Sequence, residues 1–93
     1  MLTLALALLV SAMPTDGTYR ATVDGNDYKV KVRRGEVKVV NTVTMTAIRM
    51  GRSVERRRQM IAAVKIATGC ELADPYWKDN LIMGGLDCSG SVD

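Results

Sequence analysis

Two cysteines, Cys70 and Cys88, are the residues whose type and spacing point most directly to chemistry. Seventeen residues lie between them, which differs from the C-x-x-C spacing of redox motifs. Two thiolates without histidine or further cysteine also make a poor zinc site. Cysteine pairs in small exported chains typically form disulfides. We therefore predict a structural disulfide between Cys70 and Cys88.

Histidine is absent from the whole chain. Its absence excludes Ser-His-Asp and Cys-His catalysis and removes the usual general base near neutral pH. The remaining Asp, Glu, Lys and Tyr residues show no distinctive spacing, and 93 residues leave little room for a deep pocket. Asp74 and Asp79 do not match the spacing of a calcium-binding EF-hand loop. We predict no catalytic, cofactor-binding or metal-binding residues, and hence no enzyme.

Basic residues are concentrated in one part of the chain. Residues 20–65 contain twelve Lys and Arg against four Asp and Glu, whereas residues 66–93 contain five acids against one lysine. This polarity can attract an anionic partner. The acidic part can instead fold across the basic part and neutralise it, or the basic residues can form an ordinary solvated face. The candidate contact residues are Lys29, Lys31, Arg33, Lys38 and Arg56.

The segment 74–80 contains the single tryptophan, Trp77, next to Tyr76. Because Asp74 and Pro75 favour a turn, the pattern places both aromatics in a loop. Exposed Trp and Tyr in loops often anchor a protein partner. Alternatively, Trp77 folds back to cap a core that is otherwise poor in aromatics. We consider both residues candidates for partner binding.

Three segments that alternate between apolar and polar residues must position the basic side chains. Residues 18–23, 28–32 and 36–40 each alternate with period two, and turn-forming residues separate them. This pattern predicts an antiparallel meander with Lys29, Lys31 and Lys38 on its solvent face. Thr42, Thr44 and Thr46 continue the alternation and indicate a fourth strand.

Residues 54–68 are typical of a helix, with Ser53 as N-cap and Gly69 just after the last turn. Its predicted apolar stripe consists of Val54, Met60, Ile61, Ala63, Val64 and Ala67. Its predicted solvent face carries Glu55, Arg56, Gln59 and Lys65. A strand starting at residues 70–72, a turn at 74–75 and a strand over 80–88 follow, with a bulge or bend at Gly84 and Gly85. The predicted class is α+β: an antiparallel meander of three to four strands, one packed helix and a C-terminal strand or hairpin.

The first residues predict export. Residues 2–10 form an uncharged apolar run, too short for the roughly 20 residues that span a bilayer, and small residues end it. This is typical of a secretory signal peptide over residues 1–12, which leaves residues 13–93 as a single small domain. Alternatively, residues 3–10 form a strand or a short buried helix of that domain.

These observations predict a small exported, non-enzymatic interaction module in the periplasm or outside the cell. It would bind another macromolecule, most simply a protein, as an inhibitor, adaptor or accessory subunit. The contact surface would be the Tyr76-Trp77 loop, the basic sheet face or both. The alternative is a binder of an anionic polymer, a nucleic acid or a membrane surface. A nucleic acid is the weakest of these, because no outward-facing aromatic is interleaved with the basic residues to stack bases.

Overall fold

The structure, a computed structural model, describes residues 14–89, so the predicted signal peptide lies outside the described residues. The described elements follow one another as β1, β2, β3, α2, α3, β4 and β5. The strands span Gly17–Val23, Asn26–Arg33, Glu36–Asn41, Glu71–Lys78 and Leu81–Asp87. Helix α2 spans Thr44–Met50 and helix α3 spans Val54–Thr68. The predicted α+β class is confirmed.

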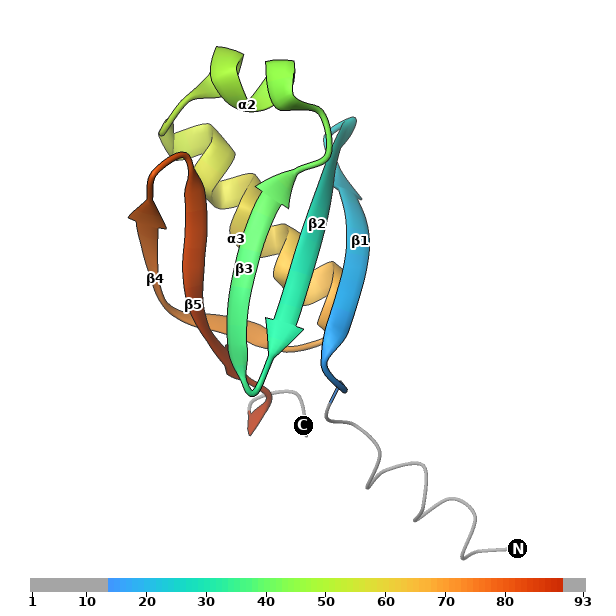
Figure 1. Cartoon of the computed structure of the whole chain (residues 1–93). Coiled ribbons are helices and arrows are strands. Elements are labelled where there is room, and N and C mark those ends of the chain that lie inside the picture. The colour runs from blue at the N-terminus through green and yellow to red at the C-terminus, as the bar shows by residue number, and fades with distance from the viewer. Residues whose placement is uncertain (1–13, 90–93) are drawn as a thin grey trace, which may run out of the picture.

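All five strands form one antiparallel sheet in the order β1-β2-β3-β5-β4. Strands β1 to β3 are the predicted meander, which is confirmed. The β4–β5 hairpin joins the free edge of β3, so the sheet has five strands instead of the predicted three to four. Helix α3 crosses one face of the sheet, and α2 lies beyond the end of β3 (Figure 1).

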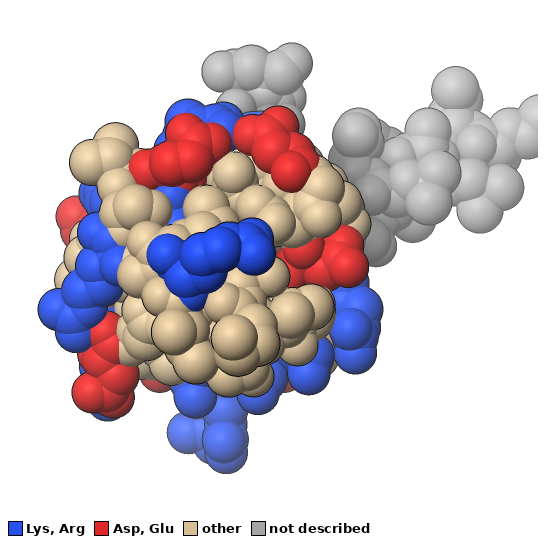
Figure 2. Space-filling model, turned by 90° about the horizontal axis from the view of Figure 1, so that it is seen from above, with Lys and Arg blue, Asp and Glu red and all other residues tan. Residues whose placement is uncertain are grey.

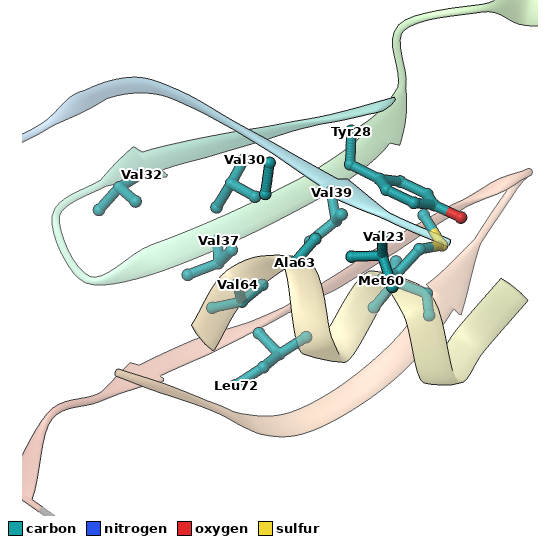
Figure 3. Packing of buried hydrophobic residues seen from close by; sticks show 12 residues of the cluster. Val23, Tyr28, Val30, Val32, Val37, Val39, Met60, Ala63, Val64 and Leu72 are labelled. Carbon is teal, nitrogen blue, oxygen red and sulfur yellow. The ribbon is translucent and has the colours of Figure 1, made fainter. Parts of the chain in front are cut away.

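The core lies between α3 and the sheet. Because strand side chains alternate between the two faces, one face of the meander is aliphatic and points toward α3 (Figure 3). Met60, Ala63 and Val64 of α3 are fully buried against it. The buried strand residues of this cluster are Ala21, Val23, Tyr28, Val30, Val32, Val37, Val39, Leu72 and Ile82. The core is therefore mainly aliphatic, as the composition predicts, with Tyr28 and Met60 as its large members.

Both predicted ends of helix α3 are confirmed. The Ser53 hydroxyl accepts a hydrogen bond from the backbone N–H of Arg56 at 3.1 Å, which satisfies one of the free donors of the first turn. Gly69 ends the helix with φ of 80°, a left-handed conformation that glycine adopts without strain. Val54 does not join the buried stripe, because its side chain is 86% exposed.

Residues 44–50 form helix α2, so the predicted fourth strand over 42–47 is wrong. The last register pairs of β3 are Val40 with Lys29 and Asn41 with Tyr28, and Thr42 adds one backbone bond to Asp27. Beyond this point there is little strand to pair with, because β2 begins only at Asn26 and β5 only at Leu81. A helix satisfies its backbone groups internally, and this outweighs the β preference of the threonines.

The predicted bulge lies in β4 rather than at Gly84 and Gly85 of β5. Register is interrupted between Ala73 and Tyr76, so Asp74 and Pro75 together lie opposite Gly84. The predicted turn at Asp74-Pro75 is thus part of a continuous strand. A Cβ atom at Gly84 would lie 2.7 Å from the Ala73 carbonyl oxygen, so the bulge requires glycine there.

Candidate binding surface

The face of the sheet turned away from α3 carries the basic side chains of the strands. Lys29 and Lys31 alternate with the buried residues of β2 and therefore point to this side. The basic residues of this surface, which we call the open face, are Arg20, Lys29, Lys31, Arg33, Lys38 and Lys78. Figure 2 views the molecule from above, and blue side chains project along its lower edge, where the open face is seen edge-on.

Like charges lie directly opposite each other on neighbouring strands of the open face. Arg20 of β1 is the register partner of Lys29, and Lys31 is the register partner of Lys38 on β3. Within residues 14–89 none of these four forms an ion pair, since the ion pairs there involve α3 residues. Opposed like charges destabilise a sheet by roughly 0.2–1 kcal/mol per pair. The open face thus carries two opposed like-charge pairs, and no ion pair among residues 14–89 involves them.

The acidic part of the chain does not fold across the open face within the described residues. Glu71 instead forms an ion pair with Lys65 of α3 at 2.9 Å. Asp87 accepts hydrogen bonds from the Ser89 backbone and hydroxyl, which hold the pKa of its carboxyl below the usual range. Internal neutralisation is one alternative that the sequence raises, but within residues 14–89 no ion pair joins an acid of residues 66–89 to a basic side chain of the open face.

A depression of about 420 Å³ opens on this face between β2, β3 and the β4–β5 turn. Its rim carries basic side chains, and its apolar part is formed by Leu81 and Met83. The basic side chains that line it are Lys31, Arg33, Lys38 and Lys78. Glu36 and Asp79 also line it, so its charge is predominantly, not purely, positive.

Tyr76 and Trp77 point to opposite sides of β4. Tyr76 is the register partner of Met83 and is 52% exposed, so it extends the open face at its edge. Trp77 is the partner of the fully buried Ile82 and packs against the core. Of the two aromatics, Tyr76 is thus the one available to a partner, whereas Trp77 caps the core.

Arg56 is buried, with 1% of its surface exposed, so the prediction that it faces solvent is wrong. Its Nε donates to Asn41 Oδ1 at 2.7 Å, and its Nη1 to the Gly51 carbonyl at 3.1 Å and Asn80 Oδ1 at 3.0 Å. Nη2 donates to the Asn80 carbonyl at 2.7 Å, and the guanidinium lies 5.4 Å from the centre of the Trp77 ring. Burial lowers the pKa of Arg56. These contacts connect α3 to the β4–β5 turn and give Arg56 a structural role.

Gln59 is also buried, against the prediction that it faces solvent. Its Oε1 accepts hydrogen bonds from the Tyr28 hydroxyl at 2.7 Å and from Asn26 Nδ2 at 2.8 Å. Burial raises the pKa of Tyr28, so its hydroxyl stays a donor. Both buried polar side chains of α3 are thus hydrogen-bonded, as buried polar groups generally must be.

A charged network extends from this site to the surface. Arg58 forms ion pairs with Asp24 and Glu55, and Gln59 Nε2 donates to Glu55 Oε2 at 3.0 Å. The hydrogen bonds from Arg58 and then Gln59 lower the pKa of Glu55 from 4.5 to about 2. Arg58 therefore links the first turns of α3 to the β1–β2 hairpin through Asp24, and Glu55 holds Arg58 from within the same helix.

The Glu55→Gln variant should lose a pH-dependent part of this stabilisation. A carboxyl whose pKa is lowered on folding stabilises the protein above its unfolded pKa, and loses that effect as pH falls through the folded one. The difference in urea midpoint between wild type and variant should thus be largest above about pH 5, shrink below pH 4.5 and vanish near pH 2. In an Arg58→Ala background the difference should be smaller at every pH. A constant difference across this range would contradict the assignment.

The disulfide between Cys70 and Cys88 is confirmed. Cys70 directly precedes β4 and Cys88 directly follows β5. The bond therefore closes the open end of the β4–β5 hairpin, next to the register pair Glu71–Asp87.

Two members of the open face were not selected from the sequence. Arg20 is found by the alternation of residues 18–23, which already places it beside the outward lysines. Lys78 carries no such signal, because its position depends on β5 pairing with β3. Sequence patterns within one segment do not specify which distant strands become neighbours.

Comparison with protein-family models, curated proteins and solved structures finds no match to this chain. Among residues 14–89 no helix is long and apolar enough to cross a membrane. The same residues contain no group of three or more acidic or cysteine side chains arranged to hold a metal ion. The open face is therefore assessed on its own geometry and charge.

Proposed function

We propose that this protein is a small, exported, non-enzymatic binding module whose open face docks an anionic partner. The pairing of like charges, Arg20 with Lys29 and Lys31 with Lys38, carries the proposal. These pairs oppose folding, and no ion pair among residues 14–89 relieves them. A partner that supplies negative charge would convert the repulsion into attraction on binding.

The shape of the open face supports a large partner. The depression on it is framed by long basic side chains over an apolar floor that includes Met83. Tyr76 extends this surface with an exposed aromatic ring, the type of residue that anchors protein interfaces. An acidic protein, bound as by an adaptor, inhibitor or accessory subunit, and an anionic polymer both present the chemistry that this face requires.

Export to an oxidising compartment is part of the proposal. The Cys70–Cys88 disulfide supports it, since disulfides persist mainly in exported proteins and stabilise small domains there. The apolar run over residues 2–10 supports it independently.

A single charge reversal on β3, Lys38→Glu, should make the domain more stable and bind less well. The new carboxylate would face Lys31 directly, so the unfolding free energy should rise by about 0.5 kcal/mol. Affinity for a labelled heparin fragment, used as a polyanion probe, should fall. The slope of log K against log salt should decrease by about one or more. Urea unfolding and fluorescence anisotropy measure the two effects.

The matched control is Arg57→Glu, which changes net charge equally on the exposed side of α3. It should leave heparin affinity nearly unchanged. Equal loss in both variants would show that only net charge matters and would contradict a defined site. Absence of heparin binding by the wild type would overturn the proposal.

A further inference from the structure

The end of the molecule formed by α2 exposes apolar side chains that the core does not use. No residue of α2 is buried. The exposed apolar residues of this end, which we call the α2 tip, are Val43 at 51%, Met45 at 69%, Ile48 at 63% and Val54 at 86%. In Figure 2, which views this end, a broad uncharged area is crossed by a basic side chain. The fold thus leaves these four apolar side chains exposed together at one end of the molecule.

The stability of helix α2 does not explain why its apolar side chains are exposed. Helix α2 has seven residues and no side-chain hydrogen bond at its N-cap Val43, and so short a helix is unstable alone. It is held from outside: Asn80 Nδ2 donates to the Ala47 carbonyl at 3.1 Å. Polar residues at positions 45 and 48 would be held equally well, because neither side chain is buried.

Several basic side chains lie on or beside the α2 tip. Arg49 lies on α2, and Arg52 follows it, donating through Nε to the Asp79 carbonyl at 2.6 Å. At the adjoining end of the open face lie Lys29, opposite the penultimate residue of β3, and Lys78, the last residue of β4. The acids Asp24 and Glu55 at this end of the fold are engaged by Arg58 on the side of α3. Asp27 and Asp79 are the other described acids nearby, so the surroundings remain net positive.

We propose that the α2 tip inserts into the interface of an anionic lipid bilayer while the basic side chains at the adjoining end of the open face, Lys29 and Lys78, contact the lipid phosphates. This inference rests on the proposed function and names its anionic partner as a lipid surface. Such an interface has two layers, acyl chains below charged headgroups. The exposed Met, Ile and Val side chains suit the acyl layer, and the neighbouring Lys and Arg suit the headgroups. A soluble polyanion has no apolar phase to receive Met45 and Ile48, whereas a lipid surface offers an apolar layer and anionic headgroups together.

The experiment compares binding to vesicles of phosphatidylcholine with and without phosphatidylglycerol, by co-sedimentation. Wild type should bind only the anionic vesicles, and salt should weaken binding. Ile48→Gln and Met45→Gln should each lower the vesicle partition coefficient about tenfold. Ile66→Gln is the matched control, since Ile66 is 61% exposed but lies on α3 away from the tip. Circular dichroism verifies that each variant is folded.

The heparin assay separates this inference from the proposed function. If the tip variants lose vesicle binding and retain heparin binding, the inference is supported. If wild type binds heparin but not anionic vesicles, the lipid partner is wrong and the binding face stands, with an acidic protein or polymer as its partner. If Ile48→Gln and Ile66→Gln lowered vesicle binding equally, the lipid-binding inference would also be overturned. A wild-type dimer that Ile48→Gln dissociates in sedimentation would assign the tip to self-association instead.

Discussion

Replacing Arg56 by alanine should remove a large part of the stability of the domain, about 3–5 kcal/mol of unfolding free energy. Small domains of this kind are stable by only about 5–15 kcal/mol. Urea unfolding followed by circular dichroism and by Trp77 fluorescence should therefore show a greatly lowered midpoint. The tryptophan signal is informative because the guanidinium lies over its ring.

The physical reason is the number of groups that Arg56 satisfies at once. Four hydrogen bonds reach Asn41, Gly51 and Asn80. Without the guanidinium, these partly buried acceptors lose their donors, and leaving a buried polar group unpaired costs about 1–3 kcal/mol. The truncation also opens a cavity beneath Trp77.

Two further substitutions distinguish this mechanism from general damage to the helix. Arg57→Ala changes the neighbouring, exposed arginine and should alter stability by no more than about 0.5 kcal/mol. Arg56→Met retains the apolar stem and removes the donors, so it should remain nearly as destabilising as alanine. If Arg56→Ala and Arg57→Ala had similar midpoints, the structural role of Arg56 would be refuted.

Arg56 also illustrates what the sequence does and does not predict. The meander and α3 are encoded locally, by period-two alternation and by Ser53 and Gly69 at the ends of the helix, and both were predicted correctly. Three consecutive arginines look equally solvated in the sequence, although only Arg56 is buried. What buries it is the position of Asn41 and Asn80, which lie 15 and 24 residues away in the chain.

The open face, too, is predicted from the sequence only in part. The outward positions of Lys29, Lys31 and Lys38 follow from alternation alone. Their concentration into opposed pairs depends on register, which turn lengths and burial of the opposite face determine together. The α2 tip could not be predicted, because the threonine alternation favours a strand and only the lack of a neighbouring strand makes it a helix.

Reducing the Cys70–Cys88 disulfide should lower the unfolding free energy by about 3 kcal/mol, since a loop of this length gains that much freedom in the unfolded chain. The cysteines flank the register pair Glu71–Asp87, so the native hairpin keeps its ladder to β3 after reduction. The reduced protein should thus remain folded in the absence of denaturant, with a lower urea midpoint and an unchanged far-ultraviolet spectrum. The Cys70→Ala/Cys88→Ala variant should behave like the reduced protein, and reductant should not affect it further.

The disulfide and Arg56 hold opposite ends of the same hairpin. Arg56 binds the β4–β5 turn through Asn80, and the disulfide closes the open end next to Asp87. Either one alone keeps β5 in reach of β3, so the domain should stay folded without denaturant after reduction alone or after Arg56→Met alone, although each lowers its stability. Reduction of Arg56→Met should then destabilise by more than the sum of the two separate effects, because coupled contacts are not additive. Strict additivity would mean that the two ends act independently, and that the hairpin is held mainly by its ladder to β3.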